Sequence, residues 1–225
     1  MPSNDDRNRH QLIRIDARNC FVESKNDWFH LGKAHLEFMA YDASRAEGSR
    51  ATARVHIYID LPEFLQLSNE ALTGTLHTRM TRIKQRLADQ TNPPDEAERK
   101  KLNAAVYESM GGTSAERMKE RRADGMSQSR VFRIFVGQKR DYLLCAESGP
   151  GKTDAKGLIV PQYGNKPEQK VSVAMDWRDL NRLLLMTQIH YASWLTAMYS
   201  QNQNGSVGGS DDGSVCADDT QNPLW

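Results

Sequence analysis

The chain of 225 residues contains one short pattern twice, and this repetition limits the folds that it can adopt. Residues 54 to 67 read RVHIYIDLPEFLQL and residues 170 to 183 read KVSVAMDWRDLNRL, a constant offset of 116 positions. Each copy has a basic residue, apolar residues at alternate positions, an Asp and an apolar run. Such alternation is typical of a strand with one buried face. The pattern predicts one strand-to-helix unit used twice.

Both units contain the signals of a helix start. Asp60 with Glu63, and Asp176 with Asp179, place acids where free N–H groups and the helix dipole favour negative charge. Apolar residues then recur at helical spacing, which predicts that each helix packs on a sheet. These residues are Phe64, Leu65, Leu67, Leu72 and Leu76 in the first copy and Leu180, Leu183, Leu184, Ile189 and Leu195 in the second.

Strand candidates precede both units, so the predicted fold is α+β, with two repeats of antiparallel strands followed by a helix. The candidates are residues 12–17, 20–22 and 32–38 in the first half and 131–136, 142–146 and 155–160 in the second. The alternative is two unrelated strand-helix pairs in one α+β domain, because only three of the 14 aligned positions are identical.

Changes in composition predict four regions, which are a first repeat at 10–84, a charged helical insertion at 85–128, a second repeat at 129–200 and a tail at 201–225. Within the insertion we expect helices at 95–110 and 115–123. The tail is rich in Gly, Ser, Asn and Gln and has four Asp but no Lys or Arg. A segment of this composition buries too little apolar surface to fold, so we expect it to be disordered.

Composition also limits the classes of function. The first 200 residues carry 30 basic and 25 acidic side chains, so the body is mildly basic. A run of 18 apolar residues and a secretory signal are both missing from the sequence, and we expect a cytoplasmic protein. Cys20, Cys145 and Cys216 form no CxxC pair, which favours reduced thiols. With no HExxH motif and no convincing nucleophile or carboxylate pair, we expect no metal, no cofactor and no enzyme activity.

Residues 146–153, AESGPGKT, match a loose phosphate-loop pattern. A working phosphate loop needs a helix that starts at its Lys, here Lys152, so that N–H groups face the phosphates. Gly157 and Pro161 follow in a β-like run and oppose such a helix. We therefore expect residues 147–155 to form a flexible, basic hairpin loop, with nucleotide binding at 146–153 as a lesser alternative.

Cations and aromatic rings are interleaved on the predicted strands. If Val55, Ile57 and Ile59 face the helices, their neighbours face outwards. Cations neutralise phosphates and rings stack on unpaired bases, which is the chemistry of single-strand binding. The candidate nucleic-acid-binding residues are Lys33, His35, Arg54, His56, Tyr58, Arg133, Phe135, Lys139, Arg140, Tyr142, Lys152, Lys156, Tyr163, Lys166 and Lys170.

The repeated unit resembles the Whirly proteins, and each half resembles the single unit of the transcriptional coactivator positive cofactor four. Residues 31–36, LGKAHL, are similar to the Whirly Lys-Gly-Lys-Ala-Ala-Leu strand and depart from it at Leu31 and His35. Residues 156–160, KGLIV, resemble the Lys-Gly-Ile strand of the coactivator. The resemblance implies largely sequence-independent binding of single-stranded DNA, favoured over RNA, on the sheet face, and helices that pack subunits into a homo-oligomer.

The C-terminus resembles the acidic tip of bacterial single-stranded-DNA-binding proteins, which docks on partner proteins. The residues that carry this likeness are Asp218, Asp219, Pro223, Leu224 and Trp225. The likeness implies partners in replication, repair, recombination or conjugation; the alternative is a tail that only solubilises. For the whole chain, the competing function is a protein-protein adaptor that binds no nucleic acid.

Overall fold

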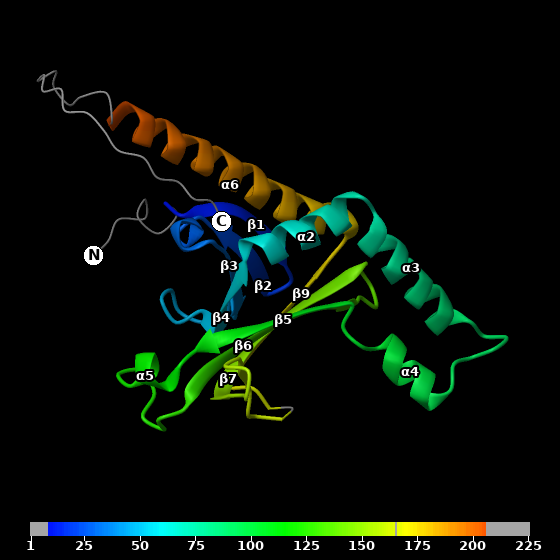
Figure 1. Ribbon diagram of the computed structural model, residues 1–225. Coiled ribbons are helices and arrows are strands. Elements are labelled where there is room, and N and C mark those ends of the chain that lie inside the picture. Colours follow the sequence, from blue (N-terminus) through cyan, green and yellow to red (C-terminus); the bar gives the residue numbers. More distant parts are fainter. Residues whose placement is uncertain (1–8, 165, 206–225) are drawn as a thin grey trace, which may run out of the picture. The chain divides into compact units, whose positions relative to one another are not determined.

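The computed structural model describes residues 9–164 and 166–205, with side chains through residue 201. The first half forms an antiparallel sheet whose strands follow the order of the sequence (Figure 1). Its elements are β1 (Gln11–Ala17), β2 (Cys20–Lys25), the 3-10 helix η1 (Phe29–Leu31), β3 (Lys33–Tyr41) and β4 (Ala51–Asp60), followed by α2 (Leu61–Leu72), α3 (Thr75–Ala88) and α4 (Glu96–Leu102). We call this sheet 1.

The second half forms another antiparallel sheet, sheet 2, in which β7 pairs with β6 on one edge and with β8 and β9 on the other. Its elements are β5 (Tyr107–Thr113), α5 (Ala115–Met118), β6 (Ser127–Val136), β7 (Tyr142–Thr153), β8 (Ile159–Pro161) and β9 (Gln169–Met175), followed by α6 (Trp177–Gly205). Two antiparallel sheets, each followed by a helix, confirm the predicted α+β class. Both sheets and α6 through Tyr191 belong to one compact unit, and α6 from Ala192 onward belongs to a second.

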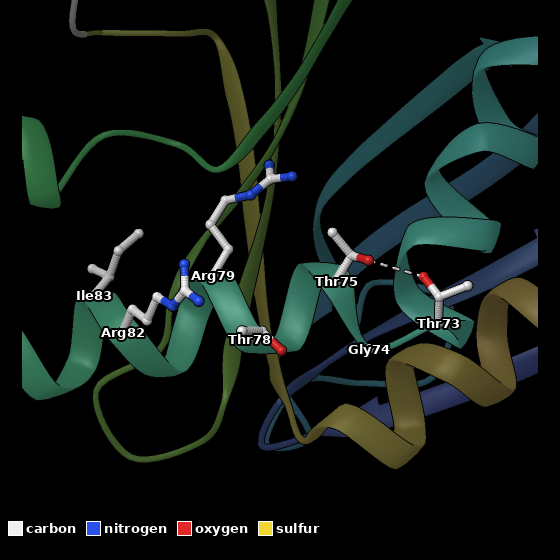
Figure 2. Close-up of a pocket in the computed structure, with 7 residues that line it drawn as sticks. All are labelled: Thr73, Gly74, Thr75, Thr78, Arg79, Arg82 and Ile83. Carbon is white, nitrogen blue, oxygen red and sulfur yellow. Dashed lines mark hydrogen bonds between the residues drawn. The ribbon is translucent and has the colours of Figure 1, made fainter.

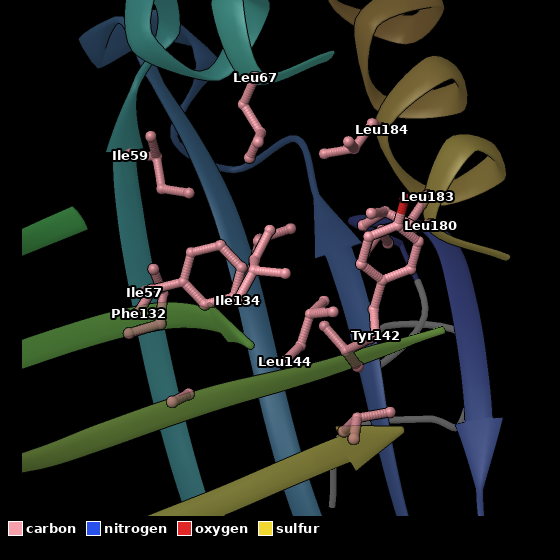
Figure 3. Packing of buried hydrophobic residues seen from close by; sticks show 14 of the residues in the cluster. Ile57, Ile59, Leu67, Phe132, Ile134, Tyr142, Leu144, Leu180, Leu183 and Leu184 are labelled. Carbon is pink, nitrogen blue, oxygen red and sulfur yellow. The ribbon is translucent and has the colours of Figure 1, made fainter. Parts of the chain in front are cut away.

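The core lies between the inner faces of the two sheets, whose strands cross one another in Figure 3. Phe38 of sheet 1 meets Phe132 of sheet 2 with ring centroids 5.7 Å apart. α2 adds Phe64 and Leu67 to this core, and the predicted stripe on α6 adds Leu180, Leu183 and Leu184. Apolar burial therefore explains the alternation in both copies, because alternate residues at 55–59 of β4 and at 171–175 of β9 enter the shared core.

The two helix starts differ, although the sequence predicts the same cap for both. Asp176 accepts a hydrogen bond from the backbone N–H of Asp179 at 2.9 Å, as predicted. Asp60 stands at the N-cap of α2 but makes no capping bond with its side chain, which is 2.6 Å from the ammonium of Lys33. Glu63 accepts from the hydroxyl of Tyr107 at 2.7 Å. Tertiary partners have replaced the local cap in the first copy.

The predicted helix at 95–110 is wrong in its second part, where residues 107–113 form β5 and pair with β6. Sheet 2 therefore starts within the segment predicted as a helical insertion. α4 ends at Leu102, and its start is capped by Asp95, which accepts from the N–H of Glu98 at 2.7 Å. The short helix predicted at 115–123 ends at Met118.

The expected hairpin loop at 147–155 is also wrong, because residues through Thr153 belong to β7. The phosphate-loop pattern thus lies on a strand, and the turn follows at 154–158. The next segment folds over sheet 2, with Ile159 against Gly112 and Gly151 and the ring of Tyr163 against Gly149. A Cβ at any of these three glycines would meet another atom at less than 3 Å. β9 pairs with β7 along its whole length.

The tail residues proposed to bind partners, Asp218, Asp219, Pro223, Leu224 and Trp225, lie outside the described residues. Their role remains a prediction. Among the described helices, none has both the length and the apolar character that crossing a bilayer requires.

Candidate nucleic-acid interface

The outer face of sheet 1 carries the largest cluster of predicted site residues. On β4, Val55, Ile57 and Ile59 are buried in the core, and the residues between them project to the other side, as the alternation predicts. The cluster is formed by Arg54, His56 and Tyr58 of β4 with His35 and Glu37 of β3, Lys25 of β2, and Asp27 and Trp28 of the following turn. We call it the outer cluster.

Glu37 is the central anion of the outer cluster, and it lies beneath its cations. Its carboxylate bonds the ammonium of Lys25 and lies 3.1 Å from the guanidinium of Arg54. The side chain of Glu37 is 4% exposed, whereas that of Arg54 is 52% exposed. Burial alone would raise the pKa of Glu37, but the adjacent Lys25, His56 and Arg54 outweigh burial, and its pKa lies below the usual value. An anion approaching this face therefore meets the cation before the carboxylate.

Two histidines form a hydrogen-bonded chain beside Glu37. Nδ1 of His35 is 2.8 Å from the carboxylate of Asp27, and Nε2 is 3.0 Å from Nδ1 of His56. Because a carboxylate only accepts, Nδ1 of His35 donates; the Nε2 of a neutral His35 then accepts from His56. Burial is the main cause that lowers the pKa of His35, and burial also lowers the pKa of His56 to about 4. Both rings are therefore neutral at pH 7.

We expect acid to destabilise the fold through His56. The unfolded chain takes up the proton near pH 6.5 and the folded chain only near pH 4, so stability falls as pH decreases through this window and levels off below it. Since His56 is partly exposed, we discount the effect to about 1–2 kcal/mol. Urea unfolding between pH 7.5 and 4.5 measures it. His56→Asn should flatten the profile and His30→Asn, at an exposed position, should not; equal slopes in all three proteins would contradict the role of His56.

Aromatic rings adjoin the charged part of the outer cluster. Tyr58 stacks on His35 with centroids 4.6 Å apart and meets Trp28 at 4.4 Å. The guanidinium of Arg130, from β6 of the other sheet, lies 5.4 Å from the Tyr58 ring centroid. Both Tyr58 and Trp28 remain partly exposed. Rings of this kind, beside cations, suit base stacking.

Sheet 2 carries a second group of predicted residues on its own outer face. Glu147 of β7 is 2.9 Å from Arg133 of β6 and 2.8 Å from Lys170 of β9. Arg133 also bonds Glu108 of β5. The neighbouring Lys170 and Arg133 hold the pKa of Glu147 below its usual value, against the effect of burial. The inner faces of the sheets meet in the core, so the predicted residues are divided between two faces that point away from each other.

The other predicted residues occupy different surroundings. Tyr142 is 1% exposed and faces the core, with its pKa raised to about 12 by burial, so it cannot stack on a base. Lys33 pairs with Asp60, and Arg140 lies 3.4 Å from Asp176. Phe135 is half-buried on β6, and the ring of Tyr163 covers Gly149. The remaining lysines are exposed on turns and strand ends: Lys139, Lys152, Lys156 and Lys166.

Sequence reasoning missed six members of the two groups: Lys25, Asp27, Trp28, Glu37, Glu108 and Glu147. Glu37 and Glu147 are acids within apolar strands, and this unusual placement was the available signal. Lys25 ends a strand that was predicted to stop at residue 22. Trp28 lies in a turn, and only the fold brings its ring to Tyr58.

A pocket of about 460 Å³ opens at the junction of α2 and α3 (Figure 2). Thr73 and Thr75 bond each other there at 3.1 Å. Arg79 donates to the Val106 carbonyl and to Glu70. These polar groups have partners within the protein, and we assign the pocket no ligand. In the described part of the chain, no three His, Cys, Asp or Glu side chains are arranged as metal ligands.

We found no match to this chain among family models, curated proteins or solved structures.

Proposed function

We propose that this protein binds single-stranded DNA, largely independently of sequence, on the outer face of sheet 1. The observation that carries the proposal is the layering of the outer cluster, in which a half-exposed Arg54 lies above the buried Glu37. Trp28 and Tyr58 provide partly exposed rings on the same face. Phosphates and unpaired bases need this combination of fixed cation and accessible ring. The role is binding, without catalysis.

In this proposal, the buried carboxylate lowers the entropy that its cation loses when a phosphate binds. A free arginine side chain loses about 2 kcal/mol of rotamer entropy when it is fixed. Glu37 already holds Arg54 in one place, so less entropy is lost when a phosphate binds. We further propose that the C-terminal residues recruit replication, repair, recombination or conjugation proteins.

The test is fluorescence anisotropy of a labelled single strand of about 30 nucleotides, compared with matched duplex and RNA, at two salt concentrations. We expect the single strand to bind best and to bind more weakly at higher salt. Arg54→Ala should lower affinity about 3- to 10-fold and reduce the salt slope by about 0.7. Arg99→Ala, an exposed arginine on α4, is the matched control and should change neither.

If the protein binds no single strand at low salt, the proposal is wrong. The second candidate is then an assembly module, which exposed apolar residues on α2 and on α6 before Ala192 favour. These are Leu72 on α2 and Trp177, Leu185 and Ile189 on α6. An interface of that kind should be insensitive to salt, and the homo-oligomer implied by the Whirly resemblance would use it.

A further inference from the structure

The two sheets contain the same arrangement of charges. In sheet 1, the carboxylate of Glu37 on β3 forms ion pairs with Lys25 of β2 and Arg54 of β4. In sheet 2, the carboxylate of Glu147 on β7 forms ion pairs with Arg133 of β6 and Lys170 of β9. Each carboxylate thus lies on a central strand and takes one cation from each neighbouring strand. We call each arrangement a clamp.

The outer cation of each clamp occupies the same place in its half of the chain. Arg54 lies six residues before Asp60 and Lys170 six residues before Asp176, and α2 and α6 start immediately after these two acids. The side chains are equally accessible, at 52% for Arg54 and 53% for Lys170. Both carboxylates lie below, at 4% and 11%. On both faces, therefore, a cation that a buried carboxylate holds in place is exposed to solvent.

The registers of the two clamps differ. Lys170 is directly opposite Glu147 across the ladder, whereas Arg54 is opposite Met39 and reaches along β3 to Glu37. In sheet 2 the exposed cation is thus paired directly with the residue that carries the carboxylate, whereas in sheet 1 it is not. In both sheets the exposed cation lies over a buried acid. Packing alone does not require this, since a surface lysine or arginine can extend into water.

An aromatic ring accompanies each clamp. Tyr58 lies four residues after Arg54 on the same side of β4, and the partly exposed Phe135 projects from the same side of β6 as Arg133. Cation and ring are the two groups that a phosphate and an unpaired base require. Duplex DNA keeps its bases stacked inside, so the ring favours a single strand.

We propose that each chain has two separate single-strand-binding faces, one on each sheet, and so holds two strands at once. This inference rests on the proposed function and adds the second face. The two outer faces are separated by the shared core, so we expect each to bind its own short strand. One chain would then bring together two strands, or two distant parts of one strand.

The test is the number of oligonucleotides bound per chain. A strand of about 10 nucleotides is long enough for one face. Titration at chain concentrations well above the dissociation constant should reach two strands per wild-type chain. Arg54→Ala and Lys170→Ala should each bind one strand with the wild-type affinity and the second about 3- to 10-fold more weakly, and the double variant should bind both strands more weakly. Counting per chain makes the result independent of self-association.

Charge-preserving variants separate loss of the clamp from loss of the fold. Arg54→Lys and Lys170→Arg should both retain two strands, with circular dichroism unchanged throughout. One strand per wild-type chain, or two strands bound by Lys170→Ala with unchanged affinity, overturns the second face and leaves the proposed function standing. A wild-type chain that binds no strand overturns the proposed function and this inference together.

Discussion

Replacing Glu37 with Gln is expected to lower the free energy of unfolding by about 3 kcal/mol. The change keeps the volume of the side chain but removes the charge that Lys25 and Arg54 share. Lys25 is only 18% exposed, so its ammonium would remain poorly solvated without that partner. Its second acid, Glu23 at 3.1 Å, limits the loss. Urea unfolding followed by circular dichroism measures the change.

Two further variants serve as comparisons for Glu37→Gln. Glu108→Gln removes an exposed carboxylate from Arg133 and should cost less than about 1 kcal/mol. Combining Glu37→Gln with Lys25→Met should recover part of the stability, because the unpaired charge is then gone. If Glu37→Gln costs no more than Glu108→Gln, Glu37 does not organise the outer cluster.

Replacing Phe38 with Ala is expected to cost about 3–5 kcal/mol, the usual range for deleting a buried aromatic ring. Phe38 is fully buried, and its ring joins sheet 1 to Phe132 of sheet 2. Deleting the ring opens a cavity at the point where the inner faces meet. Such a loss is a large part of the 5–15 kcal/mol that stabilises a typical domain.

Chemical denaturation compares Phe38→Ala with Met110→Ala, which truncates an exposed side chain on β5. The control should lie within about 0.5 kcal/mol of the wild type. A difference of less than 1 kcal/mol between the two variants would mean that the sheets are held together elsewhere.

Local periodicity predicted the parts of the fold that depend on local sequence. The alternation at 55–59 and 171–175 located β4 and β9, and the apolar stripe after Asp176 located α6. β5 was missed because its sequence, YESMGGT, has polar residues and two glycines and follows a helix without a clear stop signal. β7 was cut short because Gly149, Pro150 and Gly151 are typical of a turn.

The candidate site depended on information that periodicity does not contain. Alternation correctly placed Arg54, His56 and Tyr58 on one face, but it could not separate sheet 1 from sheet 2 or show that both faces hide a carboxylate. Those facts require the register of three strands in each sheet. Tyr142 illustrates the limit, since its ring turned out to fill the core.

The order of strands has a consequence for synthesis of the chain. In sheet 1 every strand pairs with its neighbour in the sequence, so the sheet can form from local contacts as soon as residue 60 has emerged from the ribosome. Its inner face, with Leu36, Phe38 and Val55, has no cover from sheet 2 until β6 to β9 arrive more than 60 residues later. During that interval the nascent half exposes the part of its apolar face that α2 does not cover, and we expect chaperone protection to matter there.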